Sequence, residues 1–296
     1  MLFRSFKGGR SFYTQAVDAA LAEIERLPGR HLYFLDDHLF GDSHFASALF
    51  DGMRGMGRLW QAAGTVNSVL QPHLLEKAVR CGLRSLFVGF ETTNIHNLRE
   101  QRKMQNVRHD YGRAVRRLHD LGVMVNGSFV FGMDADDQTV FDRTVEWAIS
   151  EGIETSTFHI LTPYPGTALY TRMQQAGRML HDNWDLYDTR HTVFQPKLLT
   201  PQELEDGYWS AYKNFYRWGS ILRGASAKQT WPGRLRHFGY AAGWKKFEPL
   251  WDLVIRLRQV TLMLPMLETI LSEFGQREAN RDDRGTPYAP RAAFPY

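Results

Sequence analysis

Short apolar strands alternate with amphipathic helical segments along the first half of the chain. Five times, a helix-like segment ends at a glycine and an apolar run of strand length begins directly after it. Glycine tolerates the left-handed backbone conformation that ends many helices. Strands that alternate with helices at this spacing predict βα units and a parallel sheet. The glycines are Gly29, Gly57, Gly82, Gly122 and Gly152, and the apolar runs are LYFLDD, LWQAAG, SLFVGFE, VMVNGSFVFGM and ETSTFHIL.

The helical segments of this repeat carry apolar residues at helical spacing, which predicts one buried face for each. The repeat stops at Pro163. Beyond it we expect a short helix, an aromatic loop and then a helix that starts at Thr200-Pro201-Gln202-Glu203, a string typical of a capped helix start. The helices predicted up to that point are Ala16–Leu27, Phe45–Met56, Pro72–Arg80, Asp110–Leu121, Gln138–Ser150 and Thr167–Gln175.

Composition adds limits on the class of protein. The chain has 296 residues, of which 43% are hydrophobic, enough for a sizeable core. Its one cysteine, Cys81, excludes an intramolecular disulfide and a multi-thiolate metal site within the chain. The first residues lack the continuous apolar core of a signal peptide, and no apolar run reaches the roughly 18 residues of a spanning helix. We therefore expect a cytoplasmic protein.

Polar side chains gather where the predicted strands end, which is where parallel sheets bind ligands. Asp36 and Asp37 close the first strand and could grip an amine, a cation or a ribose, or one of them could cap the next turn. Glu91 could bind a ribose or an amino acid, or pair with a loop arginine. Asn126 and Ser128 alternate with large apolar residues, so both point either into a polar barrel interior or towards the helices.

Taken together, these stretches resemble the radical S-adenosylmethionine (SAM) superfamily, in particular its members with a B12-binding domain ahead of the barrel. The resemblance runs from about Phe6 to Trp218. It implies an α/β fold with an incomplete parallel (β/α)6-type barrel, which we place at residues 1–165. A mainly helical extension over 166–274 and a disordered tail over 275–296 are expected to follow. The matching stretches are LYFLDDHLFGD, SLFVGFETTN followed by LREQRKMQN, DYGRAVRRLHDLGVMVNGSFVFGMDADD, and FHILTPYPGTALY.

By resemblance, seven positions of this chain bind SAM. Two carboxylates after the family's second strand take the methionyl amino group, and one on the fourth strand lies near the ribose or methionyl part. The fifth strand contacts ribose and adenine, and a basic residue in the loop after the fourth strand often meets the SAM carboxylate. The two carboxylates after the second strand are Asp36 and Asp37, and the one on the fourth strand is Glu91. The fifth-strand positions are Asn126, Ser128 and Gly132, and the basic loop residue is Lys103.

The cluster motif of the family is absent from this chain. Radical SAM enzymes cleave SAM reductively with a [4Fe-4S] cluster, usually held by CxxxCxxC, whereas Cys81 stands alone and before a strand. Without the first strand, the cluster loop and any B12-binding domain, the chain is either a fragment or late start of a longer gene or a degenerate member of the family. We favour the fragment, inactive as written, because nothing else in the barrel stretches looks eroded. The parent activity implied is cleavage of SAM to a 5′-deoxyadenosyl radical, often with cobalamin-dependent methyl transfer to a small-molecule or lipid-like substrate.

Two alternatives from other classes remain open. One is a metal-dependent hydrolase on a (β/α) barrel, with zinc or a hard metal held by Asp36, Asp37, His38, Asp134 and His159. The other is a module that binds a membrane or nucleic-acid surface through the C-terminal third. Residues 207–260 hold ten Lys/Arg and the two acids Glu248 and Asp252 among many aromatic residues, and an apolar helix is predicted at 249–271. That pattern also fits a protein peripheral to the membrane, or a packed surface with solvated basic heads.

Overall fold

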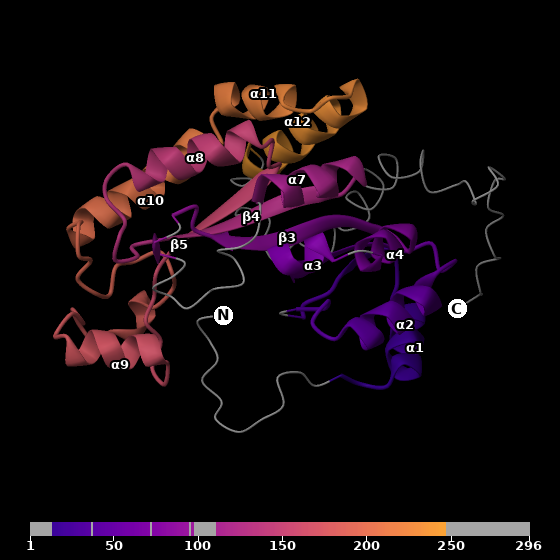
Figure 1. Ribbon diagram of the computed structural model, residues 1–296, viewed down its shortest axis with the longest axis horizontal. Helices are drawn as coiled ribbons and strands as arrows, with labels where there is room; N and C mark the ends of the chain where they lie inside the picture. Colours follow the sequence, from indigo (N-terminus) through magenta and orange to yellow (C-terminus); the bar gives the residue numbers. More distant parts are fainter. Residues whose placement is uncertain (1–13, 37, 72, 95, 98–110, 247–296) are drawn as a thin grey trace, which may run out of the picture.

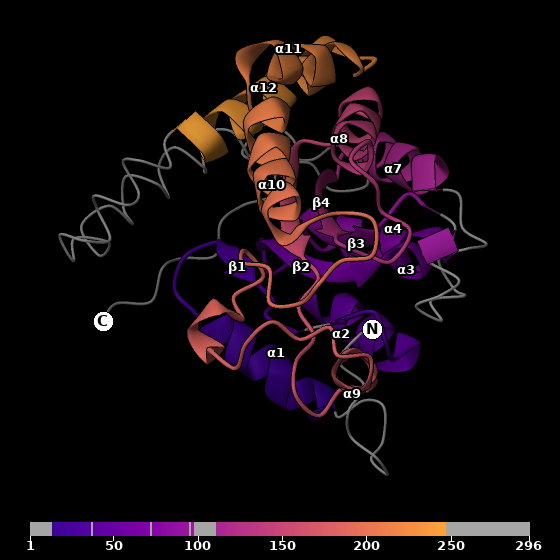
Figure 2. The ribbon, with the colours of Figure 1, turned by 90° about the vertical axis from the view of Figure 1, so that its left-hand side faces the viewer.

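The computed structural model describes residues 14–36, 38–71, 73–94, 96–97 and 111–246, and its central feature is a parallel sheet (Figure 1). The strands lie side by side in chain order, and each neighbouring pair is parallel. The sheet curls into half of a barrel with helices around its outer side (Figure 2), which confirms the predicted incomplete (β/α) barrel. The strands are β1 His31–Tyr33, β2 Leu59–Thr65, β3 Leu83–Glu91, β4 Met124–Phe131 and β5 Thr155–Ile160.

The helices predicted from the apolar stripes are present, with ends that shift by a few residues. The short helix α3 was not predicted; it begins at a capping box made by Thr65 and Ser68. No described helix is both long and apolar enough to cross a bilayer. The predicted helix 249–271 and tail 275–296 lie outside the described residues. The helices are α1 Val17–Arg26, α2 Ser43–Met53, α3 Val66–Leu70, α4 Leu74–Arg80, α7 Tyr111–Asp120, α8 Val140–Ser150, α9 Ala168–Gln175, α10 Pro201–Phe215, α11 Trp218–Ser226 and α12 Trp231–Lys246, with the 3-10 turn η1 Trp184–Leu186.

The glycines that punctuate the sequence do have left-handed backbones. All five have φ between 66° and 110°. Gly82 shows why the residue type matters, because a Cβ added there would lie 1.8 Å from the carbonyl oxygen of Arg58. The same glycine accepts a backbone hydrogen bond from Trp60, so it sits directly against β2. Glycine therefore sets both the helix end and the close approach of the following strand.

Aromatic side chains fill the space between the sheet and its outer helices. Phe90 and Phe129 stack with ring centroids 5.6 Å apart, and Trp147 of α8 packs edge-on against both. Phe90 and Phe129 are completely buried. Figure 1 shows α7, α8 and α10 along this side of β4 and β5. The core of the protein therefore lies on the outer face of the half-barrel.

Helix α10 covers the open edge of the last strand. The Tyr216 hydroxyl donates to the carbonyl of Ser156 at 2.8 Å and accepts from its amide at 2.9 Å. One turn earlier, the Tyr212 hydroxyl accepts from the amide of Phe158 at 3.1 Å. An uncovered edge strand would leave these backbone groups unpaired. The predicted Thr200 cap is confirmed as a capping box with Glu203, and it starts the helix at the place that positions both tyrosines.

A buried ionic cluster holds the C-terminal helices against the barrel. Glu154, which precedes β5, is 3% exposed and accepts from the Lys228 ammonium at 2.5 Å and the Val125 amide at 2.9 Å, and its Oε2 atom lies 3.3 Å from His119 Nε2. Burial alone would raise the pKa of Glu154, but the His119 hydrogen bond and the Lys228 charge outweigh it and hold the pKa at about 2. Burial lowers the pKa of His237 to about 4, so this ring is neutral at pH 7.

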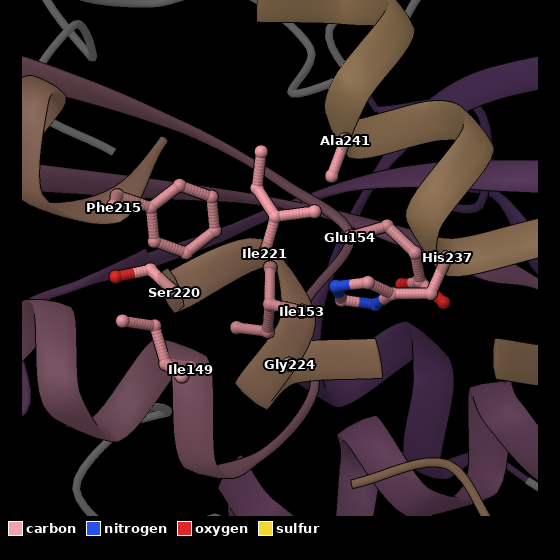
Figure 3. A pocket seen from close by; sticks show the side chains of 9 residues that line it. All are labelled: Ile149, Ile153, Glu154, Phe215, Ser220, Ile221, Gly224, His237 and Ala241. Atoms are coloured by element: carbon pink, nitrogen blue, oxygen red, sulfur yellow. The ribbon is translucent and has the colours of Figure 1, made fainter. Parts of the chain in front are cut away.

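A small cavity lies between this cluster and helices α8, α11 and α12. Figure 3 shows the His237 ring beside Glu154, with Ile153 and Ile221 across from it. The cavity volume is about 10 Å³, roughly the room needed for one water molecule. The His237 Nδ1 atom is buried without a hydrogen-bond partner among the described residues.

Candidate functional site

The sheet has an apolar outer face and a polar inner face. Side chains alternate between the faces along each strand, and parallel register aligns them across strands. Phe90 and Phe129 lie on the outer face, against the helices. Ser128 pairs in register with Thr157, one residue out of step with Phe129, so both point to the inner face together with Asn126. Of the two orientations left open by the sequence, Asn126 and Ser128 therefore have the one that points into the barrel interior.

Two acceptor atoms on this inner face lack hydrogen-bond partners. Asn126 Oδ1 and Thr157 Oγ1 are buried, and neither has a partner among the described residues. The two side chains come from adjacent strands, since Asn126 pairs with Thr155, two residues before Thr157. Buried polar atoms in native proteins are nearly always hydrogen-bonded. Two neighbouring acceptors without partners therefore indicate that a bound molecule donates hydrogen bonds to them. A ligand with N–H or O–H groups would supply them.

Glu91 ends β3 in an unusual backbone conformation. Its φ is +67°, a value that costs a residue with a side chain about 1–3 kcal/mol. The strand register shifts between Gly89 and Glu91, and the Glu91 Oε1 atom lies 3.4 Å from where a Cβ of Gly89 would be. The carboxylate therefore folds back over the inner face at Gly89, which is in register with Ser128. Strained backbones of this kind concentrate at functional sites.

His159 on β5 faces this carboxylate. Burial lowers the pKa of His159, and the charge of nearby Glu91 opposes the shift without cancelling it. The His159 Nδ1 atom lies 3.2 Å from the hydroxyl of Thr189, a residue that itself has φ +66° and whose carbonyl accepts from the Ile160 amide at 2.7 Å. The aromatic loop after α9 thus fixes the histidine ring. Sequence reasoning assigned neither Thr157 nor His159 to SAM, although both share the alternation of TSTFHI.

The loops after β3 and β4 are tied to each other by Asp136. Its Oδ2 accepts from the amides of Gly132 and Met133, both at 3.0 Å, and its Oδ1 accepts from the Asn97 side chain at 2.6 Å. Asn97 in turn accepts from the Ala135 amide at 3.0 Å. Burial raises the pKa of Asp136 to about 6, since the carboxyl group is 1% exposed. The contact between Asn97 and Asp136 was not predicted from the sequence. It holds the rim of the inner face rigid.

Asp134, a ligand in the hydrolase alternative, already has two basic partners. Its carboxylate accepts from Arg178 and Lys197, each at 2.8 Å. Burial would raise the pKa of Asp134, but the hydrogen bonds from Lys197 and Arg178 outweigh it and lower the pKa. In the part of the chain that the structure describes, no group of three His, Cys, Asp or Glu side chains could hold a metal ion.

The other residues predicted to bind SAM are placed as follows. Asp36 lies exposed in the segment after β1, because this strand ends at Tyr33, earlier than predicted. Asp37 and Lys103 lie outside the described residues. Gly132 has φ +94°, and a Cβ there would lie 2.7 Å from Leu204 of α10, so packing accounts for this glycine. The backbone amide of Gly132 donates a hydrogen bond to the Asp136 carboxylate.

Cys81 is remote from the polar inner face. It ends α4 and precedes the amino end of β3, whereas Glu91 stands at the carboxyl end of the same strand. The thiol is 5% exposed and donates to the Ala78 carbonyl at 3.2 Å. Burial raises the pKa of Cys81 to about 12, so the thiol stays protonated near neutral pH. It packs as a small apolar residue.

Comparison with known proteins places this fold. No protein-family model matches the chain. It is 30% identical over 226 residues to bacteriochlorophyllide d C-12(1)-methyltransferase of Chlorobaculum tepidum, an alignment that covers 74% of this chain and 49% of the relative. The chain thus spans about half the length of this curated relative.

Two solved structures share the fold. The radical S-adenosylmethionine methyltransferase TsrM of Kitasatospora setae, with cobalamin and a [4Fe-4S] cluster bound, superposes with a TM-score of 0.50 at 14% identity, over 68% of this chain and 38% of that one. The radical SAM enzyme HemN, coproporphyrinogen III oxidase of Escherichia coli, also gives 0.50, at 12% identity, over 69% and 44%. These matches confirm the resemblance: the chain is similar in sequence to a bacteriochlorophyllide methyltransferase and shares the fold of solved radical SAM enzymes.

Proposed function

We propose that the inner face of this half-barrel binds SAM and that the chain is the barrel core of a radical SAM, cobalamin-dependent methyltransferase. The observation that carries the proposal is the pair of unpaired buried acceptors, Asn126 Oδ1 and Thr157 Oγ1, beside the Glu91 carboxylate. The curated relative supports methyl transfer to carbon, because its name gives a carbon position. The substrate proposed for the whole protein is a small or lipid-like molecule.

The residues of the inner face match the groups that SAM carries. Ribose hydroxyls and amine hydrogens are donors, which the two acceptor atoms need. The Glu91 carboxylate attracts the positive charge of the methionyl amine or the sulfonium. His159 is half-buried, and burial lowers the pKa of its ring, which favours the neutral form, so it adds a polar contact without favouring a competing positive charge. When bound, SAM supplies the methyl group and the sulfonium that is cleaved reductively; the chain binds, orients and shields it.

The [4Fe-4S] cluster does not fit the residues of this chain. Its iron atoms need thiolate ligands, and the one thiol in the sequence is Cys81, buried away from the inner face. Cobalamin is proposed for the parent protein, and no residue of this chain is assigned to it.

The polypeptide of residues 1–296 should therefore stay colourless after anaerobic reconstitution with iron and sulfide. One thiolate cannot replace three, and no second cysteine is available within the chain. Iron and sulfide analysis with a visible absorption spectrum checks this. A stoichiometric charge-transfer band with matching iron and sulfide would prove the expectation wrong.

SAM binding should depend on the Glu91 carboxylate and not on the strand that carries it. Glu91→Gly removes the charge and relieves a backbone conformation that costs about 1–3 kcal/mol, which offsets the extra conformational entropy that glycine loses on folding, so the free energy of unfolding should not fall. Without a cluster to hold the methionyl end, wild-type affinity for SAM should lie in the high micromolar to millimolar range, about −4 to −6 kcal/mol. Titration by ligand-observed NMR should show that Glu91→Gly weakens it further.

Glu146→Gln is the matched control for that experiment. Glu146 is an exposed carboxylate on α8, paired with Arg223 on the outer side of the protein. Its loss should leave SAM binding unchanged. If Glu91→Gly and Glu146→Gln bind SAM as the wild type does, Glu91 is not part of the site. If Glu91→Gly unfolds, its role is structural.

A further inference from the structure

Helices α11 and α12 form a hairpin whose outer side exposes large apolar residues. Trp218 and Leu222 are 49% and 58% exposed on α11, and Trp231 and Leu235 are 68% and 56% exposed on α12. Figures 1 and 2 both place this hairpin at the end of the molecule opposite α1. Single exposed apolar residues are ordinary, but large ones gathered on one element point to a binding surface.

These side chains form one continuous stripe. Trp218 stacks on Phe238 with ring centroids 5.9 Å apart, which sets the pairing of the two helices. Leu222 follows Trp218 by one helical turn, and Leu235 precedes Phe238 by nearly one turn, so the antiparallel hairpin brings the two leucines to the same side. We call these four residues, together with Trp231, the hairpin stripe: Trp218, Leu222, Trp231, Leu235 and Phe238.

The hairpin stripe lies within a strongly basic segment. Residues 207–246 contain eight Lys/Arg and no Asp or Glu. Lys228 and Arg223 are used in ion pairs with Glu154 and Glu146. Arg217 and Arg234 are exposed and form no ion pair with any described residue. Each donates one hydrogen bond within the chain, Arg217 to Ser220 and Arg234 to the Lys228 carbonyl. A stripe of Trp and Leu edged by basic groups without ion-pair partners suits a partner that is apolar and negatively charged at once.

We propose that the hairpin stripe docks on a membrane surface rich in anionic lipids. Amphipathic helices with Trp and Leu on one side and Lys and Arg beside them lie in the headgroup region in this way. Each Lys or Arg near such a surface adds attraction to anionic headgroups, and tryptophan favours the interface between water and acyl chains. The proposal concerns attachment to the surface, and it is independent of the SAM site.

Two other occupants fit the stripe less well. Single-stranded nucleic acid stacks its bases on aromatic rings, but two of the five stripe residues, Leu222 and Leu235, offer no ring. A second copy of the chain, docked by the same face, would bring basic segments together without any acid in residues 207–246 to pair with them. An acyl surface accepts leucine and tryptophan alike.

The test is co-sedimentation of the full chain with vesicles. The chain should bind vesicles that mix phosphatidylglycerol with phosphatidylcholine, bind pure phosphatidylcholine vesicles at least about tenfold more weakly, and lose binding as salt rises. Trp231→Ala with Leu235→Ser should weaken binding at least about tenfold, and so should Arg217→Glu with Arg234→Glu.

Matched controls come from the opposite part of the molecule. Trp184 in η1 is 54% exposed, and Arg26 lies in the last turn of α1, so Trp184→Ala and Arg26→Glu test an exposed tryptophan and a surface charge of the same kind. Both should bind vesicles as the wild type does. The proposal fails if the controls weaken binding as much as the stripe variants. It also fails if the wild type ignores anionic vesicles at low salt, whether or not it binds a single-stranded oligonucleotide.

Discussion

Replacing Lys228 by alanine should lower the free energy of unfolding by about 3–5 kcal/mol, the usual cost of leaving one partner of a buried ion pair alone. Lys228 and Glu154 are 8% and 3% exposed, and the carboxylate lies beneath α11 and α12. Arg223→Ala is the matched control, because it breaks an exposed pair with Glu146 that is worth about 0–1 kcal/mol. Urea unfolding of the variants measures the difference.

The acid dependence of stability tests the same cluster from another side. The pKa of Glu154 in the folded chain is about 2, below its usual value of 4.5, so its contribution is present above about pH 4.5 and is lost as the pH falls towards 2. The pKa of His237 is lowered from 6.5 to about 4, so this residue also makes the protein less stable as the pH falls from about 6.5 to about 4. In Lys228→Ala, the free energy of unfolding should fall less steeply between about pH 4.5 and 2 than it does in the wild type. If Lys228→Ala and Arg223→Ala lowered the free energy of unfolding by the same amount, that result would contradict this account of the cluster.

Gly82→Ala should be the most damaging of the glycine substitutions at the helix ends. The left-handed backbone costs alanine about 1–2 kcal/mol, and the contact of the new methyl with the Arg58 carbonyl adds about 1–3 kcal/mol of strain. Gly57→Ala has a similar backbone, φ +66°, but nothing within 4 Å of its Cβ, so it should cost the first amount alone. Chemical denaturation of both variants gives the difference, and equal stabilities would show that β2 and β3 adjust freely at Gly82.

The order of strands and helices could be predicted from the sequence because its signals are local. A glycine past a helix end and an apolar run after it specify each βα unit without reference to any other part of the chain. The same holds for the Thr200 cap, which needs only Glu203 three residues on. Thus all five strands and the start of α10 were predicted, whereas β1 proved shorter than the run LYFLDD, because its ladder with β2 ends at Tyr33.

The candidate site was predictable in part. Alternation along β4 put Asn126 and Ser128 on one face, but only the packing of Phe129 against α8 decides that this face is the interior. Alternation alone cannot say which face the helices cover.

The remaining contacts join residues that are far apart in the chain. Asn97 and Asp136 are separated by 39 positions, and Lys228 and His119 by 109. No periodicity links such pairs, so neither the rim of the inner face nor the ionic cluster under the extension left a local signal. The Thr189 contact with His159 is of the same kind, since it depends on the path of a loop.

The central claim, that the polar inner face is a SAM site, is tested most directly by mapping the ligand on an isotope-labelled chain. Titration with SAM or S-adenosylhomocysteine should shift the side-chain amide of Asn126 and the backbone amides around Gly89, Ser128 and Thr157. Amides of α1 and α12 should stay in place. Saturable shifts confined to those inner-face groups are the result the account predicts. No shift at millimolar ligand, or shifts that map to another surface, would contradict it.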